Sequence, residues 1–259
     1  MRVHVLGCYA ATPRSYNNPT AQVLELPKNL FLIDCGEGTQ VAFRRKKLKF
    51  SRLEHIFISH LHGDHFFGLP GLVSTLRLLG RDKPLTIHGP KGIKEAITLL
   101  LKLGDSWTDY PLYFNELDSK SSEVILELEN LRVSTIPLEH RIYTNGFLFE
   151  TKQKSENTWQ PQYAFCSDTK YSERIAPLIQ EVKCLYHEST FLAQEERLCE
   201  YTKHSSARQA AMVAKQANAQ NLLLGHYSTR YKDLNLFRLE AETIFKNVLL
   251  AEDGATFDF

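Results

Sequence analysis

The sequence lacks the features that mark several large protein classes. No stretch approaches the ~18 consecutive apolar residues of a membrane-spanning helix. Residues 1–7 form a short strand-like pattern interrupted by Arg2 and His4, which does not resemble a signal peptide. The five cysteines are odd in number and show no CxxC spacing. Several of them lie in apolar runs, as small buried side chains do in a reducing compartment. We therefore expect a cytoplasmic protein.

A strong charge of one sign is also missing. Lys and Arg together number 31 and Asp and Glu 30, which gives a formal net charge of +1. No global field therefore attracts a polyanion such as nucleic acid, whose recognition would depend on local basic patches and bound metal ions. The clearest patch covers residues 44–49, with Arg52 nearby. It is either a solvated helix face or a phosphate contact.

The chain does contain enough apolar material for a sizeable core. With 259 residues, of which 43% are hydrophobic, one large α/β domain over residues 1–259 is expected. Strand-like and helical patterns alternate, which favours two sheets covered by helices. No linker, low-complexity tract or repeat in residue identity divides the chain. Strands are predicted at residues 3–6, 21–26, 30–33, 85–88, 124–128, 131–136, 146–150, 163–167, 184–187, 221–224 and 248–251. Helices are predicted after residue 38 and at 69–79, 93–103, 173–180, 205–217 and 234–245.

Four side chains that can bind metal ions occur within six residues, directly after an apolar strand-like run. His60 and His62 alternate and can face one ion, whereas Asp64 and His65 follow a glycine turn and can face a second. Zinc takes imidazole and carboxylate ligands at about 2.0–2.2 Å, and two-metal hydrolytic sites hold their ions about 3.5–4 Å apart. A lone histidine is more often a packed or surface residue. Four such residues in six predict a metal site.

Two metal ions need further ligands, and three other strand-like runs end in suitable residues. His140 follows the run at residues 131–138, Asp168 ends the run from 163, and His226 ends the run from 222. Functional groups gather at the carboxyl ends of strands in α/β folds. Each residue alone would be an ordinary polar strand end. The recurrence of an apolar strand followed by His or Asp predicts that they complete the metal site.

The order of these residues resembles that of the metallo-β-lactamase superfamily. Residues 34–38, Asp-Cys-Gly-Glu-Gly, are similar to the strand-ending Asp-x-Gly turn of that superfamily. Three further strings resemble the ribonuclease Z family, endonucleases that mature tRNA 3′ ends, and the opening residues 7–14 resemble its first glycine-containing turn. The strings are HESTF at 187–191, KHSSA at 203–207 and GHYSTRY at 225–231. The resemblance implies an αββα sandwich, with two mixed β-sheets flanked by helices.

The same resemblance implies a dizinc endoribonuclease that cleaves precursor tRNA at its 3′ side and leaves a 3′-hydroxyl on the tRNA. Two dications can lower the pKa of a water molecule toward neutrality and stabilise the charge that develops on a phosphodiester. Asp64 can also accept the proton of the nucleophile. Manganese or iron could occupy the same ligands. We assign the ligands as His60, His62 and His140 for one Zn²⁺, Asp64, His65 and His226 for the other, and Asp168 as the bridge.

Departure of a ribose oxygen requires a proton donor. His204 is the candidate acid, and Glu188 is the carboxylate that orients it and keeps it protonated. Considered alone, His204 could be a surface histidine before a helix. Ser205 and Ser206 suit the N-cap of that helix, whose positive end would lie beside His204 and favour a phosphate.

Phosphate contacts are expected close to the ligand His226. Ser228 and Arg230 follow it within four residues, and arginine binds phosphate bidentately. A solvated turn is the alternative. Thr12 and Arg14 are further candidates, and Tyr143 could stack on a terminal base.

The chain departs from the resemblance at one place. Members of the family carry a long protruding arm between the positions of His140 and Asp168, but only the polar residues 152–162, with two lysines, are available here. A short loop is expected there. The resemblance also implies a homodimer. The alternative functions are a hydrolase of a small molecule, such as a thioester, a lactone or a cyclic nucleotide, and a non-enzymatic RNA-binding protein.

Overall fold

The computed structural model describes residues 1–12, 14–153 and 157–259. These residues form two compact units, and each is described by itself. Unit 1 comprises residues 1–118 and 252–258, and unit 2 comprises residues 119–251 and 259. The expectation of a single domain over residues 1–259 stays a prediction. None of the helices in the described ranges is both long and apolar enough to cross a membrane.

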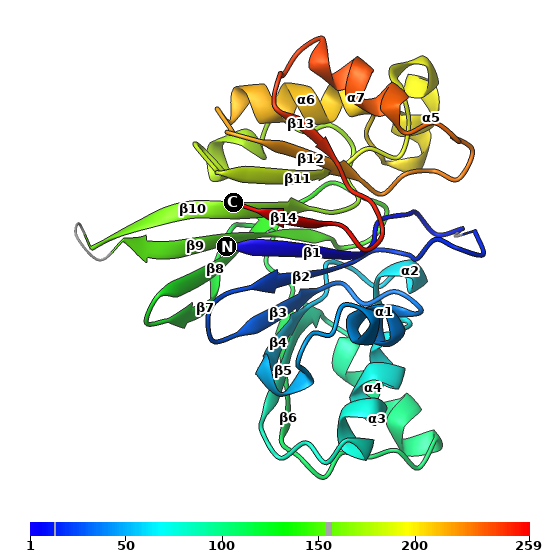
Figure 1. Ribbon diagram of the computed structural model, residues 1–259, viewed down its shortest axis with the longest axis vertical. Helices are drawn as coiled ribbons and strands as arrows, with labels where there is room; N and C mark the ends of the chain where they lie inside the picture. Colours follow the sequence, from blue (N-terminus) through cyan, green and yellow to red (C-terminus); the bar gives the residue numbers. More distant parts are fainter. Residues whose placement is uncertain (13, 154–156) are drawn as a thin grey trace. The chain divides into compact units, whose positions relative to one another are not determined.

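The described residues of unit 1 form a seven-stranded mixed sheet (Figure 1). β1 pairs antiparallel with β14 and β2, and β2 pairs antiparallel with β3. The pairings from β3 through β6 are parallel. The strands in spatial order are β14 (Thr256–Asp258), β1 (Arg2–Gly7), β2 (Ala21–Glu25), β3 (Leu30–Ile33), β4 (Leu53–Phe57), β5 (Leu85–Pro90) and β6 (Leu112–Leu117).

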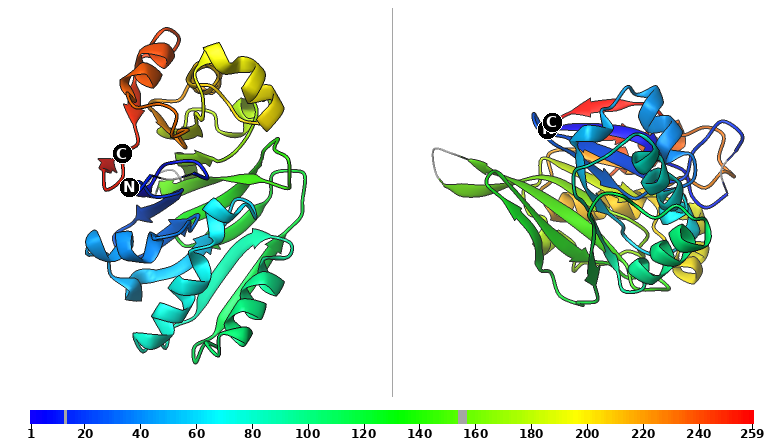
Figure 2. Two further views of the ribbon diagram at one scale, coloured as in Figure 1. Left: turned by 90° about the vertical axis from the view of Figure 1, so that its right-hand side faces the viewer. Right: turned by 90° about the horizontal axis from the view of Figure 1, so that it is seen from below.

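Helices cover one face of this sheet (Figures 1 and 2). Leu32, Ile56 and Ile87 of the strands lie in one fully buried cluster with Leu72 and Ile97 of the helices. Burying each such side chain stabilises the fold by about 1.5–3 kcal/mol. The segments predicted as helices in this unit are amphipathic, and they form helices because their apolar sides pack into this cluster. The helical segments are α1 (Thr39–Arg45), the 3₁₀ turn η1 (Phe50–Arg52), α2 (Gly63–Phe66), α3 (Leu69–Leu78) and α4 (Ile93–Leu103).

Within the described part of unit 2, a second seven-stranded sheet repeats the same order of pairings. Three antiparallel pairings, from β7 to β10, are followed by three parallel pairings, from β10 to β13. The repeat is therefore one of topology, although residue identity does not show it. The strands in spatial order are β13 (Val248–Leu250), β12 (Leu222–Gly225), β11 (Cys184–Glu188), β10 (Thr158–Cys166), β9 (Asn145–Gln153), β8 (Leu131–Pro137) and β7 (Val124–Leu128).

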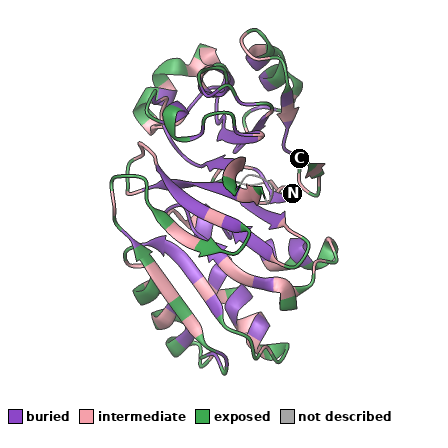
Figure 3. Cartoon of the chain, turned by 90° about the vertical axis from the view of Figure 1, so that its left-hand side faces the viewer, coloured by how far each residue is buried: buried purple, intermediate pink, exposed green. Residues whose placement is uncertain are grey.

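The helices of unit 2 confirm two predictions and correct a third. A capping box starts α6: Ser206 Oγ accepts from the N–H of Gln209, and Gln209 Oε1 accepts from the N–H of Ser206. The helix predicted at 173–180 is wrong: Pro177 lies inside this segment and has no N–H for a helical hydrogen bond, and only a 3₁₀ turn forms. The helical segments are η2 (Ala176–Leu178), η3 (Ala193–Glu195), α5 (Glu196–Thr202), α6 (Ala207–Gln216) and α7 (Asn235–Glu242). The buried strands and exposed outer helix sides are visible in Figure 3.

Strands β9 and β10 continue through most of the segment predicted as a loop at 152–162. Thr158 pairs with Gln153 and Trp159 pairs with Lys152 in antiparallel register. The Lys152 Nζ atom lies 5.6 Å from the Trp159 ring centroid, so cation–π attraction supports this pairing. The predicted loop is therefore too long. Its residues 154–156 lie outside the described residues.

Candidate functional site

The cluster after β4 gathers its donor atoms in two close pairs within unit 1. The Nε2 atom of His60 lies 3.0 Å from Nδ1 of His62, and Nε2 of His65 lies 3.3 Å from Oδ2 of Asp64. The rings of His60 and His65 are 4.1 Å apart at their centroids. His60, Asp64 and His65 are buried. The division into two pairs is the one that the spacing predicted.

Asp34 holds this cluster from the end of β3. Its Oδ2 accepts hydrogen bonds from His65 Nδ1 (2.7 Å) and from the Ser59 hydroxyl (2.9 Å). The Ser59 hydroxyl in turn lies 3.0 Å from His60 Nδ1. One fully buried carboxylate therefore orients a histidine of each pair, which matches the way that metal-binding imidazoles are usually fixed through their second nitrogen.

The backbone that follows Asp34 packs directly against the backbone of Asp64 and His65, and this allows the Asp34 carboxylate to reach the cluster. The N–H of Cys35 donates to the carbonyl of His65 at 2.7 Å. A Cβ atom at Gly36 would lie 2.5 Å from the carbonyl oxygen of Asp64, a distance that a side chain does not tolerate. The glycine of the Asp-x-Gly string is thus required by packing against α2. Asp34 itself has φ of 55°, in the left-handed region that Asp and Asn tolerate best.

In unit 2, the carboxylate of Asp168 lies between two imidazoles. Its Oδ1 is 3.2 Å from Nε2 of His226, and its Oδ2 is 3.7 Å from Nε2 of His140. The three residues follow β10, β12 and β8 and are all buried or nearly so. Each carboxylate oxygen therefore faces a different histidine.

The Nδ1 atoms of His140 and His226 also have hydrogen-bond partners within unit 2. His140 donates from Nδ1 to the carbonyl of Lys203 at 2.8 Å, and His226 Nδ1 lies 2.9 Å from the Thr190 hydroxyl. His226 and Lys203 have φ of 59° and 61°, and such strained backbone is concentrated at functional sites. The donor set therefore fits a metal ion in both units, because four imidazoles have Nδ1 fixed by the protein and Nε2 directed at another donor.

Glu188 and His204 form the predicted pair, also in unit 2. His204 donates from Nδ1 to Glu188 Oε1 at 2.8 Å. The other oxygen of this carboxylate accepts from the N–H and the hydroxyl of Thr190, at 3.0 and 2.8 Å. Burial alone would raise the pKa of Glu188, but the charge and hydrogen bond of His204, with the charge of His226, hold that pKa below its usual value.

His204 lies beside the ligand candidates of unit 2. Its ring centroid is 5.0 Å from that of His140 and 5.3 Å from that of His226. Possible ligand atoms of Asp168, His204 and His226 all lie within 4.8 Å of one another. A proton carried by His204 is therefore available where the ligands of unit 2 converge.

The four residues predicted to contact phosphate, Ser228, Arg230, Thr12 and Arg14, divide between the two units. In unit 2, the backbone N–H of Ser228 donates to the carbonyl of Thr190 at 3.1 Å, so this residue is tied to the Glu188 loop. The Arg230 guanidinium lies over the Phe191 ring at 5.2 Å and is half exposed. In unit 1, Thr12 is exposed and Arg14 is partly buried. Each unit thus provides two of the four residues.

Sequence reasoning missed the roles of four groups that orient the ligands: the carboxylate of Asp34, the hydroxyls of Ser59 and Thr190, and the carbonyl of Lys203. The signal for Asp34 was present, because it ends a strand as Asp168 does. A backbone carbonyl such as that of Lys203 leaves no signal in residue type. In the basic patch, Arg52 bonds Glu25 at 2.7 Å, which favours a structural role for this residue.

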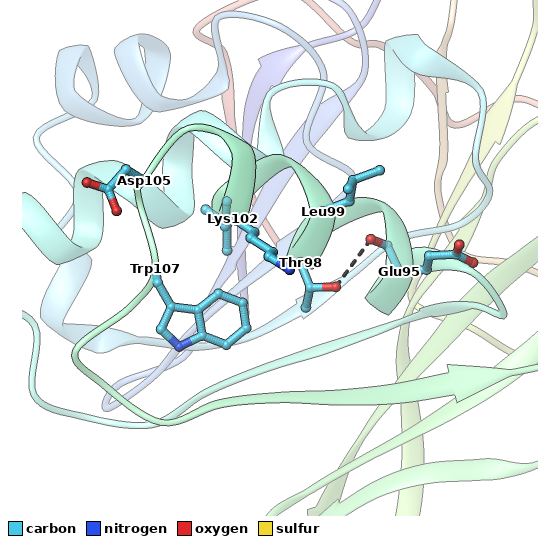
Figure 4. A pocket seen from close by; sticks show the side chains of 7 residues that line it. Glu95, Thr98, Leu99, Lys102, Asp105 and Trp107 are labelled. Atoms are coloured by element: carbon cyan, nitrogen blue, oxygen red, sulfur yellow. Dashed lines mark hydrogen bonds between the residues drawn. The ribbon is translucent and has the colours of Figure 1, made fainter.

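A surface cavity of about 570 Å³ on unit 1 has no part in this site (Figure 4). Thr98 donates to the carbonyl of Glu95 at its wall, and none of its residues is a candidate ligand. Its carboxylates outnumber its cations, which disfavours a polyanion. It is lined by Glu95, Thr98, Leu99, Leu101, Lys102, Asp105 and Trp107.

Comparison with known proteins places these features in context. A ribonuclease Z of Porphyromonas gingivalis is 39% identical over 298 positions, covering 99% of this chain and 98% of the relative. The crystal structure of the short form of human tRNase Z is 30% identical, with a TM-score of 0.86, and the match covers 100% of this chain and 99% of that chain. The family model described as anti-Pycsar protein Apyc1 matches residues 1–247.

The structural comparison confirms the predicted fold class. The metallo-β-lactamase fold protein YhfI of Bacillus subtilis matches 99% of this chain and 98% of its own with a TM-score of 0.81, at 19% identity. The two mixed sheets with their helices are those of this fold. The alignment with the P. gingivalis relative spans 298 positions, whereas the chain has 259 residues. That relative therefore carries residues without a counterpart here.

Proposed function

The chain belongs to the ribonuclease Z family, and we propose that it is a metal-dependent endoribonuclease that cleaves precursor tRNA at its 3′ side and leaves a 3′-hydroxyl on the tRNA. The observation that best supports this assignment is the hydrogen bond between His204 and Glu188 beside Asp168 and His226. A phosphodiester with a ribose leaving group needs such an acid next to the metal ligands.

We propose two Zn²⁺ ions as the cofactor. When bound, two dications would lower the pKa of a water molecule and neutralise charge on the scissile phosphate. The pairing of donor atoms within unit 1 and the position of Asp168 between two imidazoles in unit 2 support metal binding by these residues. The ligands would be His60, His62 and His140 for one ion, Asp64, His65 and His226 for the other, and Asp168 for both.

The protein's own groups would then move the protons. Asp64 would accept the proton of the attacking water, in addition to binding metal. His204, held through Nδ1 by Glu188, would donate a proton from Nε2 to the departing ribose 3′ oxygen. Because the carboxylate is buried and accepts three further hydrogen bonds, it keeps the ring in one orientation and stabilises its protonated form.

Ser228, Arg230, Thr12 and Arg14 would bind phosphates of the RNA. Support is strongest for Arg230, whose guanidinium is kept over Phe191 and remains half exposed. Arginine in this setting can bind a phosphate bidentately. We also propose that the protein acts as a homodimer in the cytoplasm. Analytical ultracentrifugation at micromolar concentration would test the dimer.

Hydrolysis of a small molecule, such as a thioester, a lactone or a cyclic nucleotide, is the competing function. The identity with ribonuclease Z over the whole chain favours RNA. The test is a side-by-side assay of precursor tRNA, a 3′,5′-cyclic nucleotide and a thioester by zinc-loaded protein. Rapid cleavage of the RNA alone supports the proposal, whereas turnover of either small molecule without RNA cleavage contradicts it.

A further inference from the structure

A second cavity, of about 620 Å³, lies entirely within unit 2. Three segments line it, at residues 119–122, 137–145 and 172–178, and one of the lining residues is the ligand candidate His140. Its volume falls in the range of about 300–1,000 Å³ that is typical of small-ligand sites. Anything bound there therefore lies next to a group that we assign to the metal site.

One side of this cavity is built from a fixed tyrosine. The Tyr143 hydroxyl donates to the carbonyl of Ser119 at 2.9 Å and accepts from Nδ2 of Asn145 at 2.8 Å. Asn145 is only 1% exposed, so the ring is anchored to the unit's interior. An aromatic ring held in this way loses little conformational freedom when a planar ligand packs against it.

The charged groups of the lining favour an anion. Lys120 and Arg174 are exposed, and no other described side chain or carbonyl forms a hydrogen bond or salt bridge with their charged groups. The carboxylate of the lining is Glu139. It is already neutralised, because it lies 3.3 Å from Lys170 and accepts from the Ser172 hydroxyl at 3.0 Å.

Apolar side chains complete the cavity. Ile142 and Leu178 line it and are 39% and 37% exposed, so both offer apolar surface to a ligand. The charge of Arg174 also acts on Glu139, but both cations of the lining are exposed. An aromatic ring, aliphatic contacts and exposed cations are the groups by which proteins hold a single-stranded nucleotide.

We propose that this cavity is a nucleotide subsite, which takes the base and a phosphate of an RNA nucleotide directly flanking the cleaved linkage. Tyr143, Ile142 and Leu178 would contact the base, and Lys120 and Arg174 the phosphate. The inference rests on the proposed function, because it is the position of His140 in the metal site that puts this nucleotide beside the cleaved bond.

The test combines variants of exposed lining residues with RNA that lacks one base. Arg174→Gln and Ile142→Ser would be combined, and Arg238→Gln, an exposed arginine of α7 outside the cavity, is the matched charge control. Precursor tRNAs would carry an abasic nucleotide on the 5′ or the 3′ side of the cleavage site. In the wild type, one of the two abasic substrates should lose ~5- to 100-fold in kcat/KM, the range expected for one stacked base.

The double variant should lose a similar factor on normal RNA and lose little more on that abasic RNA. The Arg238→Gln control should behave like the wild type on both. All proteins should bind equal amounts of zinc, because none of the three substituted residues is a ligand candidate. Equal sensitivity of the wild type and the double variant to the missing base would overturn the proposal.

Binding of 2-aminopurine riboside 5′-monophosphate tests the cavity even if precursor tRNA is not a substrate. Its fluorescence should fall on binding to the wild type and to Arg238→Gln, with at least ~5-fold weaker binding to the double variant. Unchanged binding would contradict a nucleotide subsite. Absence of RNA cleavage with intact nucleotide binding would instead count against the proposed function alone.

Discussion

The Nδ1 atom of His204 lies 2.8 Å from Oε1 of Glu188, and the other oxygen of that carboxylate is held by Thr190. His204 is thus oriented by a carboxylate whose two oxygens both accept hydrogen bonds. Removing either partner should therefore remove the same function.

We predict that His204→Ala slows cleavage of precursor tRNA by ~10²–10⁴, as expected for loss of a general acid, and that bound metal is retained. Glu188→Gln, which keeps the shape but removes the charge, should fall in the same range. The double variant should be little slower than either single variant, because groups that act as a unit are not additive. Single-turnover kinetics with metal analysis measure this. Normal turnover by His204→Ala would exclude His204 as the general acid.

Thr190 should influence metal binding without being a ligand. Its hydroxyl donates to Glu188 and accepts from Nδ1 of His226, so it orients the imidazole of a proposed ligand. Loss of such a group typically costs ~10–100-fold in metal affinity or activity. We predict this loss for Thr190→Val and recovery in Thr190→Ser, which restores the hydroxyl. Competition for zinc with a chromogenic chelator would show it, and equal affinities for all three proteins would refute the role.

Asp34 should act in the same way on the metal ligands of unit 1. Asn at this position tolerates the left-handed backbone, so Asp34→Asn keeps the turn. It removes the charge at His65 together with one acceptor oxygen, since Asp34 Oδ1 also accepts from the N–H of Ser59 at 2.7 Å. We predict ~10–100-fold weaker metal binding. The control is Asp253→Asn, a partly buried carboxylate of unit 1 that accepts from the N–H groups of Cys8 and Asn18. Asp253→Asn should lower stability but leave metal affinity unchanged. Weaker metal binding by Asp253→Asn, with normal binding by Asp34→Asn, would contradict the role of Asp34.

A histidine pair outside the site, of which His88 is buried, makes stability depend on pH. Asn115 donates to Nδ1 of His88, whose Nε2 lies 3.1 Å from Nδ1 of His55. Burial, with the nearby charge of His55, lowers the pKa of His88 to about 3. Between about pH 6.5 and 3 the unfolded chain therefore binds a proton that the folded chain excludes, and stability falls as the pH is lowered.

The expected slope is up to ~1.4 kcal/mol per pH unit for one such group. It should be shallower in His88→Gln, which cannot be protonated. Urea unfolding at pH 7, 6 and 5 in chelator, which removes the contribution of bound metal, would compare the two proteins. Identical pH dependence would show that His88 does not resist protonation.

Much of this structure is predictable from the sequence, because it depends on how residues are spaced along short segments of the chain. The two donor pairs of unit 1 follow from four residues in one short segment, and His140, Asp168 and His226 each end an apolar strand. The capped start of α6 at Ser206 is likewise local. In each case the chemistry depends on neighbours along the chain.

The rest depends on which strands become neighbours in space. β6 was not predicted, because its residues are mostly half-buried and do not alternate cleanly. β14 has three residues and forms only by pairing with β1. Thr190 and the carbonyl of Lys203 acquire their roles because loops after β11 and α5 reach ligands from other strands. Such contacts have no signature in spacing.

The most direct test of the central claim is to map the 3′ end of the tRNA released from a precursor with a defined trailer, using zinc-loaded protein. The account predicts a 3′-hydroxyl at a single position on the 3′ side of the tRNA, and no product once the metal is chelated. A 2′,3′-cyclic phosphate end, or an intact precursor with fully metal-loaded protein, would contradict it.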